Sequence, residues 1–172
     1  MHVTVPHAAF TNGITSTDAF VQRIGCLVPV ALYFLLQVGE YTNPRTVLKD
    51  GKHVCATRTK QFVVGNVVFF QNVVVNPRTA PLETLLTPDL ATLKISNQKN
   101  GQMGQTITQH STGSALCPIK ALAHIVHDIL FGGGTDDTLL CSVGNKGTWN
   151  PVEPCQVIDA VRDTSKELNL EK

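Results

Sequence analysis

The longest apolar stretch of the chain, Ile24 to Leu36, is the feature that most limits how the protein can fold. From an N-cap expected at Thr17-Asp18, apolar residues recur at helical spacing as far as Val38. Pro29 interrupts the stretch and is expected to kink or split the helix. The stretch is shorter than the roughly 20 residues that span a bilayer, and it begins too far from Met1 for a signal peptide. We therefore expect a buried core helix in an intracellular protein without a membrane partner.

The remaining segments predict a small sheet followed by two helices. Strand-like composition and alternation place strands at roughly 67–70, 92–97 and 105–109, and the glycines within 98–104 suit a hairpin connection. Helical spacing predicts helices near 118–131 and 154–168, the first opened by Pro118 and stopped by the glycines at 132–134. The fold class expected is therefore α+β: a helical N-terminal part, a small antiparallel three-stranded sheet, then helices.

One domain, residues 16–172, accounts for these elements. Residues 1–15 lack periodicity and are expected to be a poorly ordered end, and residues 43–60 are expected to form a long polar loop. The five cysteines are odd in number and scattered, which favours reduced thiols.

The charges are unevenly distributed although the net charge is only +1. Residues 41–127 carry nine basic against three acidic residues, a net of +6, whereas residues 128–172 carry four against eight, a net of −4. From Leu90 to His127 no carboxylate occurs. A surface that faces phosphates needs such a segment, because lysine and arginine displace counterions there while carboxylates repel the backbone. A chance asymmetry on a solvated face is the alternative.

Gln37 and Glu40 end the apolar stretch three residues apart, within the run FLLQVGEYT from Phe34 to Thr42, so both side chains can face one anion on a helix end. This run resembles the first active-site box of tyrosine recombinases, the phage-integrase family, whose eukaryotic transposon-type members read roughly LLR-x-GEYT. In that family the Arg grips the scissile phosphate and the Glu supports it. Gln37 stands at the position of that Arg. An ordinary helix end with a surface Glu40 is the alternative.

Three further runs extend the resemblance over roughly residues 20–170. They are Arg58–Phe62 with Asn66–Phe70, Thr92–Ile95 leading to Gln98–Gly101, and Cys117–Leu122, which is similar to the family's CPVxAL run. In the family the hairpin turn carries a catalytic lysine, so the resemblance implies that Lys99 is the proton donor for the leaving 5′-hydroxyl, with Lys94 as the fallback. A lysine suits this task because its flexible stem can reach into a groove of DNA. The alternative is that Lys99 is an exposed loop lysine without a catalytic role.

The resemblance implies a double-stranded DNA-binding domain associated with DNA integration and recombination. The residues expected to contact the phosphate backbone are Arg58, Lys60, Lys94 and Lys120. No metal and no cofactor is implied, self-association on DNA is compatible with the family, and the location is the nucleus if the source is eukaryotic. The expected fold is then a partial integrase-like catalytic core.

Several departures from the family predict a truncated or decayed member that is inactive by itself. The Arg of the first box is replaced, the second box with its His-x-x-Arg run would begin where the chain ends, and neither Tyr33 nor Tyr41 occupies the place of the nucleophile. Loss of one such donor alone costs about 10²–10³ in rate.

Other functions fit the sequence less well. Cys117, His124 and His127 could suggest a zinc site, but no second closely spaced pair of cysteines accompanies them. Gly132–Gly134 lacks the context of a nucleotide-binding loop. Two rivals stay open: a non-catalytic DNA-binding or protein-interaction module on the same fold, and an unrelated small α+β domain.

Overall fold

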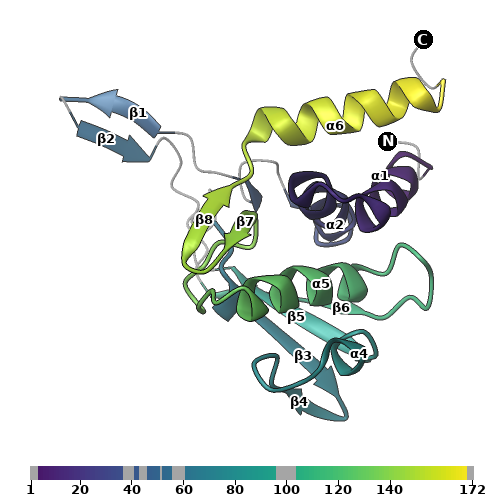
Figure 1. Cartoon of the computed structure of the whole chain (residues 1–172). Helices are drawn as coiled ribbons and strands as arrows, with labels where there is room; N and C mark the ends of the chain where they lie inside the picture. The colour runs from purple at the N-terminus through teal and green to yellow at the C-terminus, as the bar shows by residue number, and fades with distance from the viewer. Residues whose placement is uncertain are drawn as a thin grey trace.

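The computed structural model describes residues 4–36, 41–42, 46–50, 52–55, 61–95 and 104–169, with 46–49 and 52–55 described by their backbone only. Within these ranges the protein has an α+β fold in which every paired strand is antiparallel. Figure 1 shows helix α5 lying across the main sheet, with α1 and α2 beyond α5 and α6 running alongside them. The predicted α+β class is confirmed at this level.

Helix α2 (Ala19–Tyr33) is the predicted core helix. The side chain of Asp18 caps it by accepting hydrogen bonds from the backbone N–H of Phe20 at 2.7 Å and of Val21 at 3.2 Å. Pro29 does not split the helix, which continues to Tyr33. Residues on both sides of Pro29 are buried, and this packing offsets the cost of about 3 kcal/mol for an internal proline.

Helix α1 (Thr4–Thr15) occupies most of the segment that was expected to be a poorly ordered end. It buries Val5, Ala9 and Phe10, and it crosses α2 where Gly13 meets Gly25. A Cβ built on Gly25 would lie 2.6 Å from Cα of Gly13 and 2.8 Å from the carbonyl oxygen of Ala9. The helix is therefore held by a glycine-to-glycine crossing, which amphipathic periodicity does not reveal.

The main sheet has four strands in the order β4-β3-β5-β6, one more than the three predicted. Its strands are β3 (Val67–Gln71), β4 (Val73–Val75), β5 (Leu90–Ile95) and β6 (Gln105–His110). The predicted central pairing is confirmed, with Leu93 opposite Ile107 on β6 and opposite Val67 on β3. The short 3-10 helix η1 (Val64–Asn66) leads into β3, and α4 (Leu82–Leu85) follows β4.

Two further hairpins were not predicted. Strands β1 (Thr46–Lys49) and β2 (Lys52–Cys55) lie within residues 43–60, which were expected to be a loop, and this hairpin extends away from the other elements in Figure 1. Strands β7 (Ser142–Asn145) and β8 (Thr148–Pro151) form the other. In each turn a non-glycine residue with positive φ, Asp50 or Lys146, is followed in the sequence by a glycine. The pair Asp50-Gly51 is a hairpin signal that could have predicted the first of these hairpins.

The core lies between the sheet, α5 (Pro118–Phe131) and α2, and both C-terminal helices match their predicted ranges. Alternate residues of the strands, among them Phe69, Ala91 and Leu93, are fully buried on the side of α5. Helix α6 (Pro154–Glu167) adds Val157 to this core and contacts α1. The positions of the strands and of α5 thus fix which side chains each face of the sheet presents.

Arg23 is a charged residue inside this core, with only 6% of its surface exposed. Its guanidinium donates hydrogen bonds to the carbonyl oxygens of Ile125, at 3.1 Å, and Leu140, at 3.5 Å, and it lies 3.9 Å from the carboxylate of Asp128. Burial lowers the pKa of Arg23, and Asp128 opposes that shift. The side chain therefore ties α2 to α5 and to the segment before β7.

Candidate nucleic-acid interface

Most of the predicted site residues lie outside the described residues. Gln37, Glu40 and Lys99, which were expected to converge on one phosphate, lie there. The predicted phosphate contacts Arg58 and Lys60 also lie there. The described candidates are Lys94 on β5 and Lys120 on α5. These two lysines lie on different surfaces of the protein.

One face of the main sheet is exposed, and we call it the open face. Along β5, Leu93 and Ile95 point into the core, so Leu90, Thr92 and Lys94 point to the opposite side. The register places on the same side their neighbours on the other strands. None of these side chains is buried. The open face consists of Val68, Phe70, Val74, Leu90, Thr92, Lys94, Thr106, Thr108 and His110.

The open face contains no carboxylate, and no ion pair joins Lys94 to an acidic side chain in the described ranges. Lys94 is exposed to solvent and stands opposite Thr106, at the end of the hairpin whose connection carries Lys99 in sequence. Threonine hydroxyls and a lysine can both donate hydrogen bonds to phosphate oxygens. The face can therefore accept an anionic backbone without repulsion.

Lys120 does not share this face. It lies in the first turn of α5, whose neighbouring residues Ile119 and Leu122 pack in the core on the other side of the sheet. Strand alternation directs Lys94 away from that helix. The two lysines were expected to contact one phosphate backbone, but the sheet separates their surfaces, because sequence position alone does not tell which face of a sheet a helix covers.

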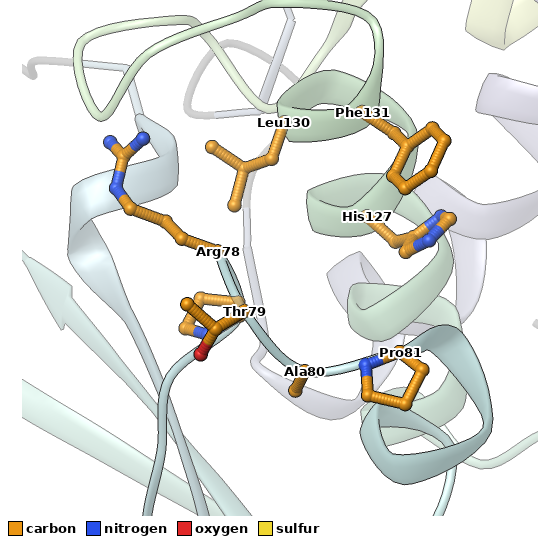
Figure 2. A pocket seen from close by; sticks show the side chains of 8 residues that line it. Arg78, Thr79, Ala80, Pro81, His127, Leu130 and Phe131 are labelled. Atoms are coloured by element: carbon orange, nitrogen blue, oxygen red, sulfur yellow. The ribbon is translucent and has the colours of Figure 1, made fainter.

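Arg78, a third basic residue of the middle segment, is engaged elsewhere. Its guanidinium forms an ion pair with Asp136 at 2.6 Å, at the edge of a cleft of about 350 Å³. Figure 2 shows the cleft between the segment from Arg78 to Pro81 and the end of α5, where His127 and Phe131 stand side by side. Their rings stack with centroids 5.0 Å apart, and Phe131 is 85% exposed. No local sequence pattern predicts this cleft, because its two sides are about 50 residues apart in the chain.

The described residues of the first-box run help to line an apolar groove of about 360 Å³ between the end of α2 and α6. Leu36 and Tyr41 contribute to it from the two sides of the undescribed residues 37–40. Burial raises the pKa of the Tyr41 hydroxyl, which is opposite to the activation that a nucleophile needs. The amide of Gln109 on β6 donates to the carbonyl oxygen of Tyr33 at 2.7 Å, so the end of α2 lies beside the β5–β6 hairpin.

The Cys-Pro run that opens α5 has a structural explanation. Pro118 occupies the first helical position and Cys117 is the N-cap. Burial raises the pKa of the Cys117 thiol, but hydrogen bonds with the Ser111 hydroxyl and with backbone N–H groups outweigh burial, so its pKa is lowered. No group of three or more metal-ligating side chains comes together in the described ranges.

Two residues that contribute to the site or to the core beneath it, Phe70 and Arg23, were not predicted from the sequence. Phe70 lies on the open face, whereas Phe69, the preceding residue of the run VVFFQ, is buried. Strand alternation puts the two rings on opposite faces of the sheet, but it does not tell which of the two faces is buried. Arg23 could have been noticed as the one charged residue within the apolar α2. Burial lowers the pKa of His124 on α5, which stands between Lys120 and His127 on one helix face.

Comparison with known proteins adds no assignment: no protein-family model, curated protein or solved structure matches the chain. Among the described helices, none has the length and apolar character needed to cross a membrane.

Proposed function

We propose that the chain is a DNA-binding domain of tyrosine-recombinase type that binds duplex DNA through its phosphates and does not cleave DNA by itself. The recombinase part of the proposal rests on the motifs at Phe34–Thr42, Thr92–Gly101 and Cys117–Leu122. Their arrangement is compatible with it, because the end of α2 lies beside β6 and α5 opens directly after the hairpin.

The observation that carries the DNA-binding part is the open face. It joins an exposed Lys94, which forms no ion pair with any acidic side chain in the described part of the chain, to three threonines and a histidine, and its residues include no acidic one. Seven of the acidic residues lie instead at Asp128 or later within the described chain, three of them on α6. Phosphate contact would therefore favour the sheet side of the protein over the side of α6.

Binding of a labelled duplex over a range of salt concentrations tests this proposal. Lys94→Gln removes the charge while keeping most of the side chain, and it should weaken binding and reduce the log–log salt slope by about 0.9. Lys166→Gln is the matched control, because Lys166 is an exposed lysine on α6 that pairs with Asp163. Joint charge reversal of Arg58, Lys60 and Lys99 should have a larger effect. Absence of salt-dependent binding, or equal effects of Lys94→Gln and Lys166→Gln, would refute the assignment.

A protein-interaction module on the same fold is the second candidate, and the exposed ring of Phe131 favours it. An exposed aromatic side chain beside a cleft is a frequent anchor in protein interfaces. The same titration separates the two functions, because a module of this kind would bind duplex DNA weakly or not at all.

A further inference from the structure

We infer that the open face of the sheet binds the unpaired bases of single-stranded DNA, with Phe70 as the stacking platform. This inference rests on the proposed function in one respect only, the identity of the ligand as DNA. It adds a second mode of contact, because a duplex offers its phosphates to the sheet but keeps the faces of its bases stacked inside.

The open face changes in polarity along the strands. At one end, Val74, Phe70 and Leu90 stand in a row across three adjacent strands. Val74 is 62% exposed, and Phe70 and Leu90 are partly exposed. At the other end stand Lys94 and Thr106. A sheet face that meets only water normally carries polar residues throughout, so the apolar row indicates that something covers it.

A single strand of DNA fits this gradient better than an apolar partner does. Its bases have apolar faces with polar edges, and its backbone is anionic, so it matches an aromatic ring, hydroxyl groups and a lysine on one surface. Aromatic side chains on the open face of a four-stranded antiparallel sheet are an established platform for stacking unpaired bases. An apolar helix would leave Lys94 and the threonines without partners.

The charges and the spacing agree with this ligand. Lys94 is four residues along β5 from Leu90, which is the neighbour of Phe70, and this corresponds to about 13 Å at 3.3 Å per residue. A base stacked on Phe70 and a phosphate at Lys94 would therefore belong to one short stretch of strand. The nearest acidic residue in the sequence is Asp89, which lies at the opposite end from Lys94 and accepts a hydrogen bond from the backbone N–H of Asn72.

Binding of a labelled 12-nucleotide single strand and of its duplex by the full chain tests the inference. Phe70→Leu keeps an apolar side chain on the sheet but removes the ring. Loss of a stacked base should weaken single-strand binding by about 5- to 150-fold, with the salt slope and duplex binding unchanged. Phe70→Tyr should retain binding. The matched control is Phe131→Leu, which removes an exposed ring on α5, outside the open face. Lys94→Gln should instead lower the single-strand salt slope by about 0.7.

The outcomes separate the two proposals. If the wild-type chain binds the duplex but not the single strand, or if Phe70→Leu binds both forms like the wild type, the inference fails while the proposed function stands. If the wild-type chain binds neither the single strand nor the duplex, both the inference and the proposed function fail. Tighter binding of the RNA strand of the same sequence would overturn DNA as the ligand. If Phe70→Leu does not fold, Thr108→Glu places a carboxylate on the exposed edge of the same face, and unchanged single-strand binding by this variant would refute the inference.

Discussion

Substitution of Gly25 by alanine is the sharpest test of the helix crossing that holds α1 in place. The new Cβ would lie 2.6 Å from Cα of Gly13 and 2.8 Å from the carbonyl oxygen of Ala9, whereas ordinary contact begins near 3.4 Å. Both obstructing atoms belong to the backbone, so no side-chain rotation can relieve the overlap. Helix α1 must move away from α2 by several tenths of an ångström or more, and the contacts of Val5 and Phe10 weaken with it.

Two opposing effects set the size of this change. Overpacking of this kind typically costs about 1–3 kcal/mol, and rigid backbone obstacles place Gly25→Ala in the upper half of that range. Replacement of glycine by alanine inside a helix contributes about 1 kcal/mol in the opposite direction. The free energy of unfolding should therefore fall by about 1–2 kcal/mol, and Tm by about 2–8 °C for a chain of this length.

Thermal unfolding followed by circular dichroism measures this change directly. Thr11→Ala is the control, because Thr11 is an exposed position of α1 where alanine improves helix propensity without a clash. This variant should unfold at or slightly above the wild-type temperature. If Gly25→Ala were as stable as the wild type or more stable, the close crossing of α1 and α2 would be wrong.

Three other predictions concern the core thiols, the buried arginine and catalysis. Arg23→Met should lower the free energy of unfolding, measured by urea denaturation, by about 1–3 kcal/mol, because two buried carbonyl groups lose a charged donor. Arg162 is exposed, so the control Arg162→Met should change the free energy of unfolding by less than about 0.5 kcal/mol. Equal effects of the two substitutions would contradict the role of Arg23. Burial raises the pKa of Cys26 to about 12 and of Cys141 to about 11, from 9.0 for a free thiol, so the unfolded chain loses these protons first. The contribution of these thiols to stability should be fully present below about pH 9 and be lost as pH rises toward their folded pKa values. In the native protein a thiol reagent should modify exposed Cys155 before buried Cys26 and Cys141; rapid modification of Cys26 would show that the core is open. A suicide DNA substrate should trap no covalent adduct, because the sequence contains no His-x-x-Arg run and neither Tyr33 nor Tyr41 stands where a recombinase nucleophile is expected. An adduct would overturn the prediction of inactivity.

Local signals in the sequence determined a large part of the fold. The cap at Asp18, the proline at the start of α5, and the alternation of Leu93 and Ile95 each act within a few residues, so α2, α5 and the β5–β6 hairpin could be predicted from the sequence. The candidate site was less accessible. Sequence could identify Lys94 as a candidate cation, but not the face on which it stands or the residues beside it.

The tertiary structure alone decided the features that depend on pairs of residues distant in the chain. Helix α1 is held by the contact of Gly13 with Gly25, Arg78 is neutralised by Asp136, and Lys94 is separated from Lys120 by the sheet. None of these has a local signal, because glycine at a crossing looks like weak helix propensity and an arginine looks the same whether or not a carboxylate faces it. Which charges are free to meet a phosphate is set by packing, and packing brings together residues whose separation along the chain gives no indication that they will meet.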